Sequence, residues 1–204
     1  MEGCEGAGKS LQCKKLYAYL IKKGIAALLT REPGGAALSE QIRRIILAAD
    51  ARVSPVAETL LYAAARAQHV VEVIGPALGN GRVVICDRFT DSSVAYQGYA
   101  RGLGADTIKE VNAFATGGVI PDISFFLDIR PEDSFGRKSK NISSDRIELE
   151  TMEFHRKVYE GYKKIAETEP ERIATVDANR GMRAVHADIL IKINHILYER
   201  GFIK

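Results

Sequence analysis

The chain has little net charge, few cysteines and no long apolar run, and each shortage argues against a class of protein. Its 29 Lys and Arg residues nearly balance 26 Asp and Glu residues, giving a net charge of +3, so nucleic-acid or membrane surfaces are not favoured. Its three cysteines (Cys4, Cys13 and Cys86) form no C-x-x-C pair, which argues against zinc and disulfide frameworks and favours reduced thiols. With no apolar run of about 18 residues and no signal peptide, we expect a cytoplasmic protein.

Length and composition instead indicate one globular domain. The 204 residues are 46% hydrophobic and 27% charged, values ordinary for a domain with a sizeable core. No internal repeat, low-complexity tract or linker interrupts the chain, so we predict a single domain over residues 1–204.

The most informative stretch is residues 3–10, which read G-C-E-G-A-G-K-S and match the phosphate loop G-x-x-x-x-G-K-[ST]. Glycines allow a tight turn that points backbone N–H groups at phosphate oxygens, and the following helix aims its positive end at the same anion. Lys9 supplies a charge for the β- and γ-phosphates, and the Ser10 hydroxyl is a Mg²⁺ ligand. The predicted nucleotide-binding residues are Gly3, Cys4, Glu5, Gly6, Ala7, Gly8, Lys9 and Ser10. The alternative, a glycine-rich turn that binds nothing, is disfavoured because a helical pattern begins directly after Ser10.

Apolar patterning predicts strands that alternate with helices. We expect strands at 25–30, 83–86, 123–127 and 173–176, and helices from Ser10 to Gly24 and at 39–47, 55 to about 79, 147–169 and 182–198. The strands at 83–86 and 123–127 are continuous apolar runs, as in strands buried on both faces. The pattern therefore predicts an α/β fold, a parallel sheet with helices on both faces.

The start of the chain conflicts with this picture. A phosphate loop normally follows a buried central strand, yet only Met1 and Glu2 precede Gly3. We therefore expect a truncated first strand and an incomplete N-terminus.

A second polar site is predicted where residues 83–86 end. Asp87 and Arg88 follow this strand directly, and ligands of open parallel sheets sit at the carboxyl ends of strands. There an acid holds Mg²⁺ through water and an arginine grips a phosphate. The alternative is an ion pair at a strand end, which we consider the weaker interpretation beside a phosphate loop.

Two further groups suit a planar base. Tyr62 and Arg66 are four residues apart on one helix face, although spacing alone favours a packed tyrosine beside a solvated arginine. Ser93 and Gln97 lie in a stretch of hydroxyls and amides, and Gln97 offers donors and acceptors for a pyrimidine edge. That stretch also fits a helix start with Asp91 or Ser92 as N-cap, and both interpretations are compatible.

A basic segment at about 136–147 is predicted to be a lid. Its basic side chains are Arg137, Lys138, Lys140 and Arg146. Such a segment is ordinarily a solvated surface, but in a phosphoryl-transfer enzyme it closes over the substrates and supplies an arginine.

The motifs together resemble those of bacterial thymidylate kinases. The likeness runs from Glu2 to the C-terminus. It is carried by E-G-x-E-G-A-G-K-S at 2–10, T-R-E-P-G-G at 30–35, L-x-x-x-x-R at 61–66, D-R-F-T-D-S-S-V-A-Y-Q-G at 87–98 and D-R-I-E at 145–148. It implies a P-loop NTPase-type three-layer fold with a five-stranded parallel sheet, and transfer of the ATP γ-phosphoryl group to dTMP with Mg²⁺. It departs from the family in the short first strand, in Phe89 for the commoner Tyr and in Ala36 for the commoner Thr.

The resemblance also implies residue roles. Arg43 and Arg88 hold the dTMP phosphate, while Glu5 contacts the sugar 3′-hydroxyl and the Mg²⁺ environment. The implied base and sugar contacts are Tyr62, Arg66, Ser93, Tyr96 and Gln97. Ser10 and Asp87 are the metal-site candidates. Because Gly6 stands where some members carry an arginine, a lid arginine is implied, Arg146 or alternatively Arg137, beside the catalytic Lys9 and Arg88.

Two rival functions and two packing arrangements remain open. Another nucleoside monophosphate kinase is disfavoured by the set Tyr62, Arg66 and Gln97, and a nucleotide-dependent switch by the lack of an N-K-x-D signature. The helix from Pro55 carries an apolar seam of Leu60, Ala64, Ala67, Val71, Ile74 and Leu78. The resemblance favours a homodimer on this seam, whereas the closing helix, with Val185, Ile189, Ile193 and Ile196, is the alternative cover within one chain.

Overall fold

The computed structural model describes residues 1–137 and 145–203. Most of the predicted lid, residues 138–144, lies outside this part. The elements are α1 (Lys9–Lys22), β1 (Ala27–Arg31), α2 (Ala37–Leu47), α3 (Pro55–His69), the π-helical turn η1 (Val70–Ile74), α4 (Gly75–Gly79), β2 (Val83–Asp87), α5 (Thr90–Ser93), the π-helical turn η2 (Val94–Ala100), α6 (Ala105–Thr116), β3 (Ser124–Asp128), α7 (Pro131–Phe135), α8 (Met152–Thr168), β4 (Ile173–Asp177) and α9 (Met182–Glu199).

Within residues 1–137 and 145–203, four strands form two parallel pairs, and the first two residues join them. β1 pairs with β2 and β3 with β4. The Met1 amine donates to the Cys86 carbonyl at 2.8 Å, and the amide of Glu2 donates to the Phe125 carbonyl at 2.8 Å. Returning bonds run from the Arg88 amide to the Met1 carbonyl and from the Leu127 amide to the Glu2 carbonyl. The expected truncated central strand is therefore present as a two-residue segment between β2 and β3.

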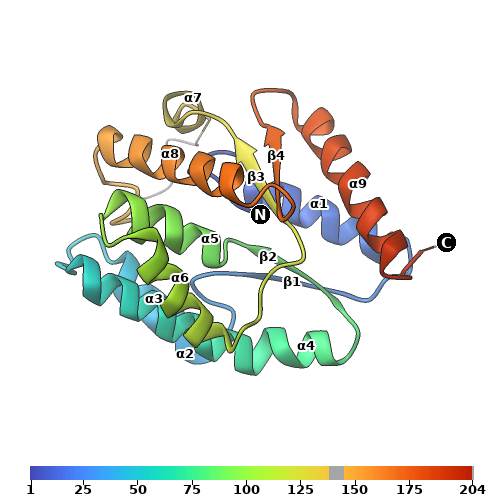
Figure 1. Cartoon of the computed structure of the whole chain (residues 1–204), viewed down its shortest axis with the longest axis horizontal. Coiled ribbons are helices and arrows are strands. Elements are labelled where there is room, and N and C mark those ends of the chain that lie inside the picture. The colour runs from blue at the N-terminus through green and yellow to red at the C-terminus, as the bar shows by residue number, and fades with distance from the viewer. Residues whose placement is uncertain (138–144, 204) are drawn as a thin grey trace.

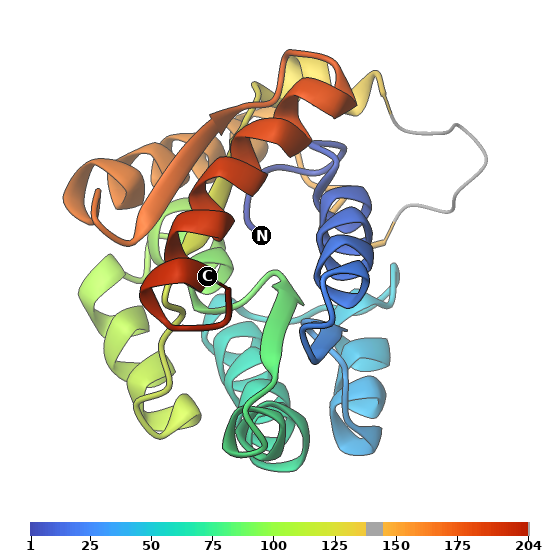
Figure 2. The ribbon, with the colours of Figure 1, turned by 90° about the vertical axis from the view of Figure 1, so that its right-hand side faces the viewer.

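Helices cover both faces of the strands, as expected. In Figure 1, α1 and α9 lie on the right of the strands and α6 and α8 on the left. On the first side Leu16 and Leu20 of α1 pack with Ile189 of α9 and with Ile85 and Leu127 of the strands. On the other side Phe126 packs among residues of η2 and α8. Figure 2 places the N-terminus at the centre of the molecule and the C-terminus at the end of α9.

Expected and observed elements differ mainly after β3. The helix predicted at 147–169 begins at Met152 instead, because Thr151 caps it by accepting from the Phe154 amide at 3.2 Å. Neither α6 nor α7 was predicted. The predicted N-cap role of Asp91 or Ser92 is wrong, because α5 begins at Thr90 and the Asp91 carboxylate pairs with Arg172 instead.

The long helix from Pro55 forms as predicted, with a π-helical turn in its path. Ser54 caps it by accepting from the Ala57 amide. Its predicted seam is largely uncovered: Leu60 is 59% exposed and Val71 is 72% exposed. The closing helix α9 packs mainly on α1 and β4. Its Ile193 and Ile196 line one cavity together with Ile74 and Leu78, so it reaches the end of the seam and leaves Leu60 and Val71 uncovered. Within the described ranges, no helix combines the length and the apolarity needed to cross a membrane.

Candidate active site

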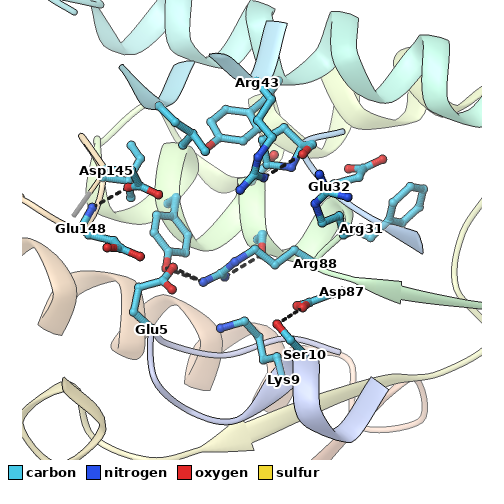
Figure 3. Close-up of a pocket in the computed structure, with 18 of the residues that line it drawn as sticks. Glu5, Lys9, Ser10, Arg31, Glu32, Arg43, Asp87, Arg88, Asp145 and Glu148 are labelled. Atoms are coloured by element: carbon cyan, nitrogen blue, oxygen red, sulfur yellow. Dashed lines mark hydrogen bonds and ion pairs between the residues drawn. The ribbon is translucent and has the colours of Figure 1, made fainter. Parts of the chain in front are cut away.

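A cavity of about 620 Å³ opens at the carboxyl ends of β1 and β2 and brings most predicted site residues together (Figure 3). Its lining includes Glu5, Gly6, Gly8, Lys9, Ser10, Arg43, Tyr62, Arg66, Asp87, Arg88, Ser93, Tyr96, Gln97 and Arg137. Four predicted residues, Gly3, Cys4, Ala7 and Arg146, are not among those that line it. The site therefore combines the phosphate loop, the end of β2, one face of α3 and the start of the predicted lid.

The phosphate loop is held tightly against the rest of the fold. Gly6 has a φ of +75°, and a Cβ there would collide with the backbone oxygen of Ser134 in α7. Lys9 is the first residue of α1 and its Nζ donates to the Cys4 carbonyl at 2.7 Å. Burial and the nearby Arg88 lower the pKa of Lys9. Burial raises the pKa of the Cys4 thiol to about 12, so Cys4 takes part through its backbone rather than as a thiolate.

Ser10 and Asp87 place two oxygen groups that can bind a metal beside Lys9. The Ser10 hydroxyl donates to the Asp87 carboxylate, and both line the cavity; Figure 3 shows the pair beside Lys9. No cluster of three or more His, Cys, Asp and Glu side chains suited to a metal occurs in the described part of the chain. A hydroxyl and a carboxylate fit Mg²⁺, since this ion takes one or two protein oxygens and completes its shell with water and phosphate.

Arg88 is the most heavily bonded cation of the site. Its Nη1 donates to the Gly3 carbonyl at 3.1 Å and to the hydroxyls of Ser92 and Tyr162, each at 3.2 Å. Its Nη2 donates to Glu5 and to the Tyr96 hydroxyl. Burial alone would lower its pKa, but Glu5 and the two tyrosines raise it well above the usual value. The guanidinium is therefore a fixed positive charge inside the cavity.

Arg66 is buried and backs the part of the cavity lined by Tyr62. Its guanidinium donates to Glu32 at 2.8 Å, to Asn112 at 2.5 Å, and to Ser93 and the Phe89 carbonyl at 3.1 Å each. These bonds use four of the five N–H groups of an arginine. The alternative expectation that Arg66 is a solvated arginine is wrong, since the residue is only 2% exposed.

The remaining polar wall is set by α2 and η2. Arg43 of α2 donates to the Pro33 carbonyl at 2.8 Å. The Gln97 amide nitrogen donates to the buried Glu58 at 2.8 Å, which fixes its orientation and leaves its amide oxygen for other donors. Both side chains therefore enter the cavity already held by bonds within the protein.

The two candidate lid arginines are placed differently. Arg137 lines the cavity and donates to the Ala178 carbonyl at 2.8 Å. Arg146 donates to the Ile46 carbonyl at 2.9 Å and to Glu58 at 2.6 Å. In this structure Arg137 is thus at the cavity, while Arg146 ties the far end of the predicted lid to α2 and α3.

Sequence reasoning missed four charged residues of the cavity: Arg31, Glu32, Asp145 and Glu148. Glu32 accepts from Arg66 and lies 3.0 Å from the ring nitrogen Nδ1 of His69. Asp145 accepts from the Glu148 amide at 3.0 Å. All four lie inside the motifs T-R-E-P-G-G and D-R-I-E, whose charged side chains were the available signal.

Comparisons with known proteins agree with this geometry. The family model described as thymidylate kinase matches residues 1–189. A thymidylate kinase of Thermoanaerobacter sp. (strain X514) is 47% identical over 189 residues, 93% of each chain. One of Bacillus velezensis is 46% identical over 199 residues, 96% of this chain and 94% of that relative. The crystal structure of thymidylate kinase from Ehrlichia chaffeensis superposes with a TM-score of 0.77 at 31% identity, covering 94% and 95% of the two chains.

Proposed function

The chain belongs to the thymidylate kinase family and is a phosphotransferase that phosphorylates dTMP with ATP, and we propose how its residues divide that work. One observation carries the assignment of roles. The phosphate loop and Arg88 face one cavity, which continues to Tyr62 and Arg66. A cavity with a triphosphate cradle at one end and a base pocket at the other suits a reaction between two nucleotides.

ATP is proposed to bind with its phosphates in the loop of residues 3–10. Backbone N–H groups and the N-terminus of α1 meet the phosphate oxygens, and Lys9 adds its charge. Ser10 and Asp87 would hold Mg²⁺, which neutralises phosphate charge during transfer. The Ser10–Asp87 contact supports this because it places both oxygen donors beside the loop.

The monophosphate dTMP is proposed to bind against α3 and η2. Arg43 and Arg88 hold its phosphate, Tyr62 stacks on thymine, and Arg66 donates to a base carbonyl. Ser93 and Gln97 complete the base contacts, and Tyr96 and Glu5 lie near the sugar. Support comes from Arg66 and Gln97 being held in place by the protein before any ligand arrives, which lowers the entropic cost of binding.

Transfer needs no covalent intermediate. A phosphate oxygen of dTMP attacks the γ-phosphorus in line as the bond from that phosphorus to the bridging oxygen breaks and ADP leaves, while Lys9, Arg88 and a lid arginine neutralise the charge that develops. An arginine supplied from the lid is favoured because Gly6 leaves no space for a side chain against Ser134. Arg146 and Arg137 are the candidates for this role.

We further propose a homodimer built on the exposed seam of α3, and a cytoplasmic location. The exposure of Leu60 and Val71 supports the first, and the three free cysteines suit the second.

A steady-state assay with dTMP, dUMP, dCMP and dAMP as acceptors tests the function. We expect dTMP to give by far the highest kcat/KM, with dTDP and ADP formed in equal amounts. A higher kcat/KM with dCMP or dAMP, or ATP hydrolysis without transfer, would contradict the proposal.

A further inference from the structure

Glu2 is a buried carboxylate next to the phosphate loop to which no role has yet been given. It is 2% exposed and both of its oxygens are used. Oε1 accepts from the Phe89 amide at 2.7 Å, and Oε2 accepts from the Ser92 hydroxyl at 2.6 Å and the Tyr162 hydroxyl at 3.0 Å. Burial and the nearby Asp91 raise the pKa of Glu2, whereas the three donors that converge on it favour its acceptor-only ionised form.

The first consequence concerns the backbone of Arg88. Arg88 has a φ of +68°, and it is the only non-glycine residue with positive φ in the described ranges. That conformation is unfavourable for an L-residue, so neighbouring contacts must hold it. The amides on either side provide them: the Arg88 amide donates to the Met1 carbonyl at 3.0 Å and the Phe89 amide to Glu2.

The second consequence concerns the Arg88 guanidinium. Its Nη1 donates to the oxygens of Ser92 and Tyr162, the same two hydroxyls that hydrogen-bond Glu2. A hydroxyl has one hydrogen and two lone pairs. Because Glu2 attracts the hydrogens of this pair, the lone pairs remain turned toward Arg88.

We propose that Glu2 is the positioning residue for Arg88, fixing both its left-handed backbone and the direction in which its guanidinium meets a substrate phosphate. The inference rests on the proposed function, in which Arg88 holds the phosphate of dTMP. It predicts that loss of Glu2 weakens recognition of the phosphate and leaves recognition of the base and sugar intact.

Glu2→Gln is the most informative variant because it keeps the shape of the side chain and replaces one acceptor oxygen with a donor NH₂ group. A glutamine amide either places its NH₂ group against the Phe89 amide, where two donors meet, or places it against the two hydroxyls, which must then accept from it and turn their hydrogens toward Arg88. Calorimetry on the full chain would compare dTMP with thymidine, which lacks the phosphate. We expect dTMP affinity to fall about tenfold, as for loss of a charge-assisted hydrogen bond of about 1.4 kcal/mol, and thymidine affinity to stay within about twofold.

Two reference variants make the result interpretable. Arg88→Ala should weaken dTMP selectively, and the exposed Glu153→Gln should change neither ligand. Equal loss of both ligands in Glu2→Gln, or no loss, would overturn the inference. If Arg88→Ala itself weakens dTMP and thymidine equally, the proposed role of Arg88 fails as well, so the two failures are distinguishable.

A second route decides the matter if thermal unfolding shows that Glu2→Gln does not fold. Tyr162→Phe combined with Ser92→Ala removes both hydroxyls, while the ring at 162 keeps its stack on Phe126 at 5.3 Å. The double variant should reproduce the selective loss of dTMP affinity. Unchanged dTMP affinity would show that Arg88 needs neither hydroxyl and would overturn the inference.

Discussion

At the scale of single residues, Lys9 is the clearest test of the transfer chemistry. Its Nζ is held by the Cys4 carbonyl at the start of α1, where a phosphate would replace or share that contact. Lys9→Ala removes the charge and no large part of the core, so we expect the fold to persist. The activation free energy should rise by several kcal/mol, which lowers kcat about 10³-fold or more. Steady-state assays of dTDP formation measure kcat, and circular dichroism measures whether the fold persists. Activity within about tenfold of the parent would contradict the proposed role.

The two lid arginines give a paired test. From the resemblance, Arg146→Ala should lower kcat far more than it raises the KM for dTMP, the mark of a contact made in the transition state. Arg137→Ala should do so instead if the residue that lines the cavity supplies the charge. Steady-state constants for both variants decide between them. A change confined to the KM for dTMP in both would exclude a lid arginine from transfer.

Residue positions can be predicted where the chemistry requires a local pattern. Lys9 and Ser10 stand in a contiguous motif, and Asp87 follows a strand directly, so all three positions can be predicted from the sequence. Glu2 and Glu32 are not, because their partners Ser92, Tyr162 and Arg66 are far away in the chain. Only the fold brings such buried acceptors to their donors.

At the scale of elements, Glu58 links α3 to η2 and to the end of the predicted lid. It is fully buried and accepts from Gln97, Arg101 and Arg146. Burial alone would raise its pKa, but these bonds lower it below the usual 4.5. A carboxyl group whose pKa is lower in the folded state than in the unfolded state stabilises the fold at pH values above its unfolded-state pKa. That stabilisation is lost as the pH falls through its folded-state pKa.

Glu58→Gln should therefore cost roughly 3 kcal/mol at neutral pH, because it leaves two arginines without their buried partner. Below about pH 4 the difference from the parent protein should narrow, since the parent carboxylate becomes protonated. Urea unfolding at pH 7 and at acid pH measures it, with the exposed Glu72→Gln as the control. A difference that stays constant with pH would contradict the assignment.

The two-residue central strand gives a second test at this scale. An apolar cavity of about 350 Å³ lies beside Met1, lined by residues that include Val84, Ile85 and Phe125. Four β-branched residues fused before Met1 would extend the strand into it. Each buried side chain contributes about 1.5–3 kcal/mol against about 1–2 kcal/mol of backbone entropy, so we expect a higher Tm. A Gly-Ser extension of equal length is the control, and an equal Tm for both would contradict the expectation.

The prediction of helices fails where the apolar periodicity is weak or where a capping residue, rather than the apolar pattern, sets the start of the helix. In α6 the only buried apolar residue is Ile108, so little periodicity marks the helix. The five-residue α7 is too short to show one. The start of α8 was misplaced because Ile147 is buried in a turn and the capping Thr151 lies beyond it. By contrast β2 and β3, read as continuous apolar runs, were predicted within one residue.

At the scale of the whole molecule, the uncovered face of α3 and the turns after it is the main feature left unexplained within one chain. Leu60 is 59% exposed, Val71 72% and Val56 58%. The opposite face carries Tyr62 and Arg66 toward the cavity. A two-fold pair of chains would cover the seam with its own copy and leave both sites open.

Sedimentation at micromolar concentration tests this pairing. We expect a species of twice the 22.4 kDa chain mass, because contiguous exposed apolar residues on one helix favour burial against a partner. Leu60→Asp places a charge on the seam and should shift the species to the monomer. Ile191→Asp changes a side chain that is 69% exposed on α9, a helix that packs on α1 and β4 rather than on α3, and should leave the dimer intact. A parent protein that sediments as a monomer, or a Leu60→Asp variant that dimerises as well as the parent, would refute pairing through this face.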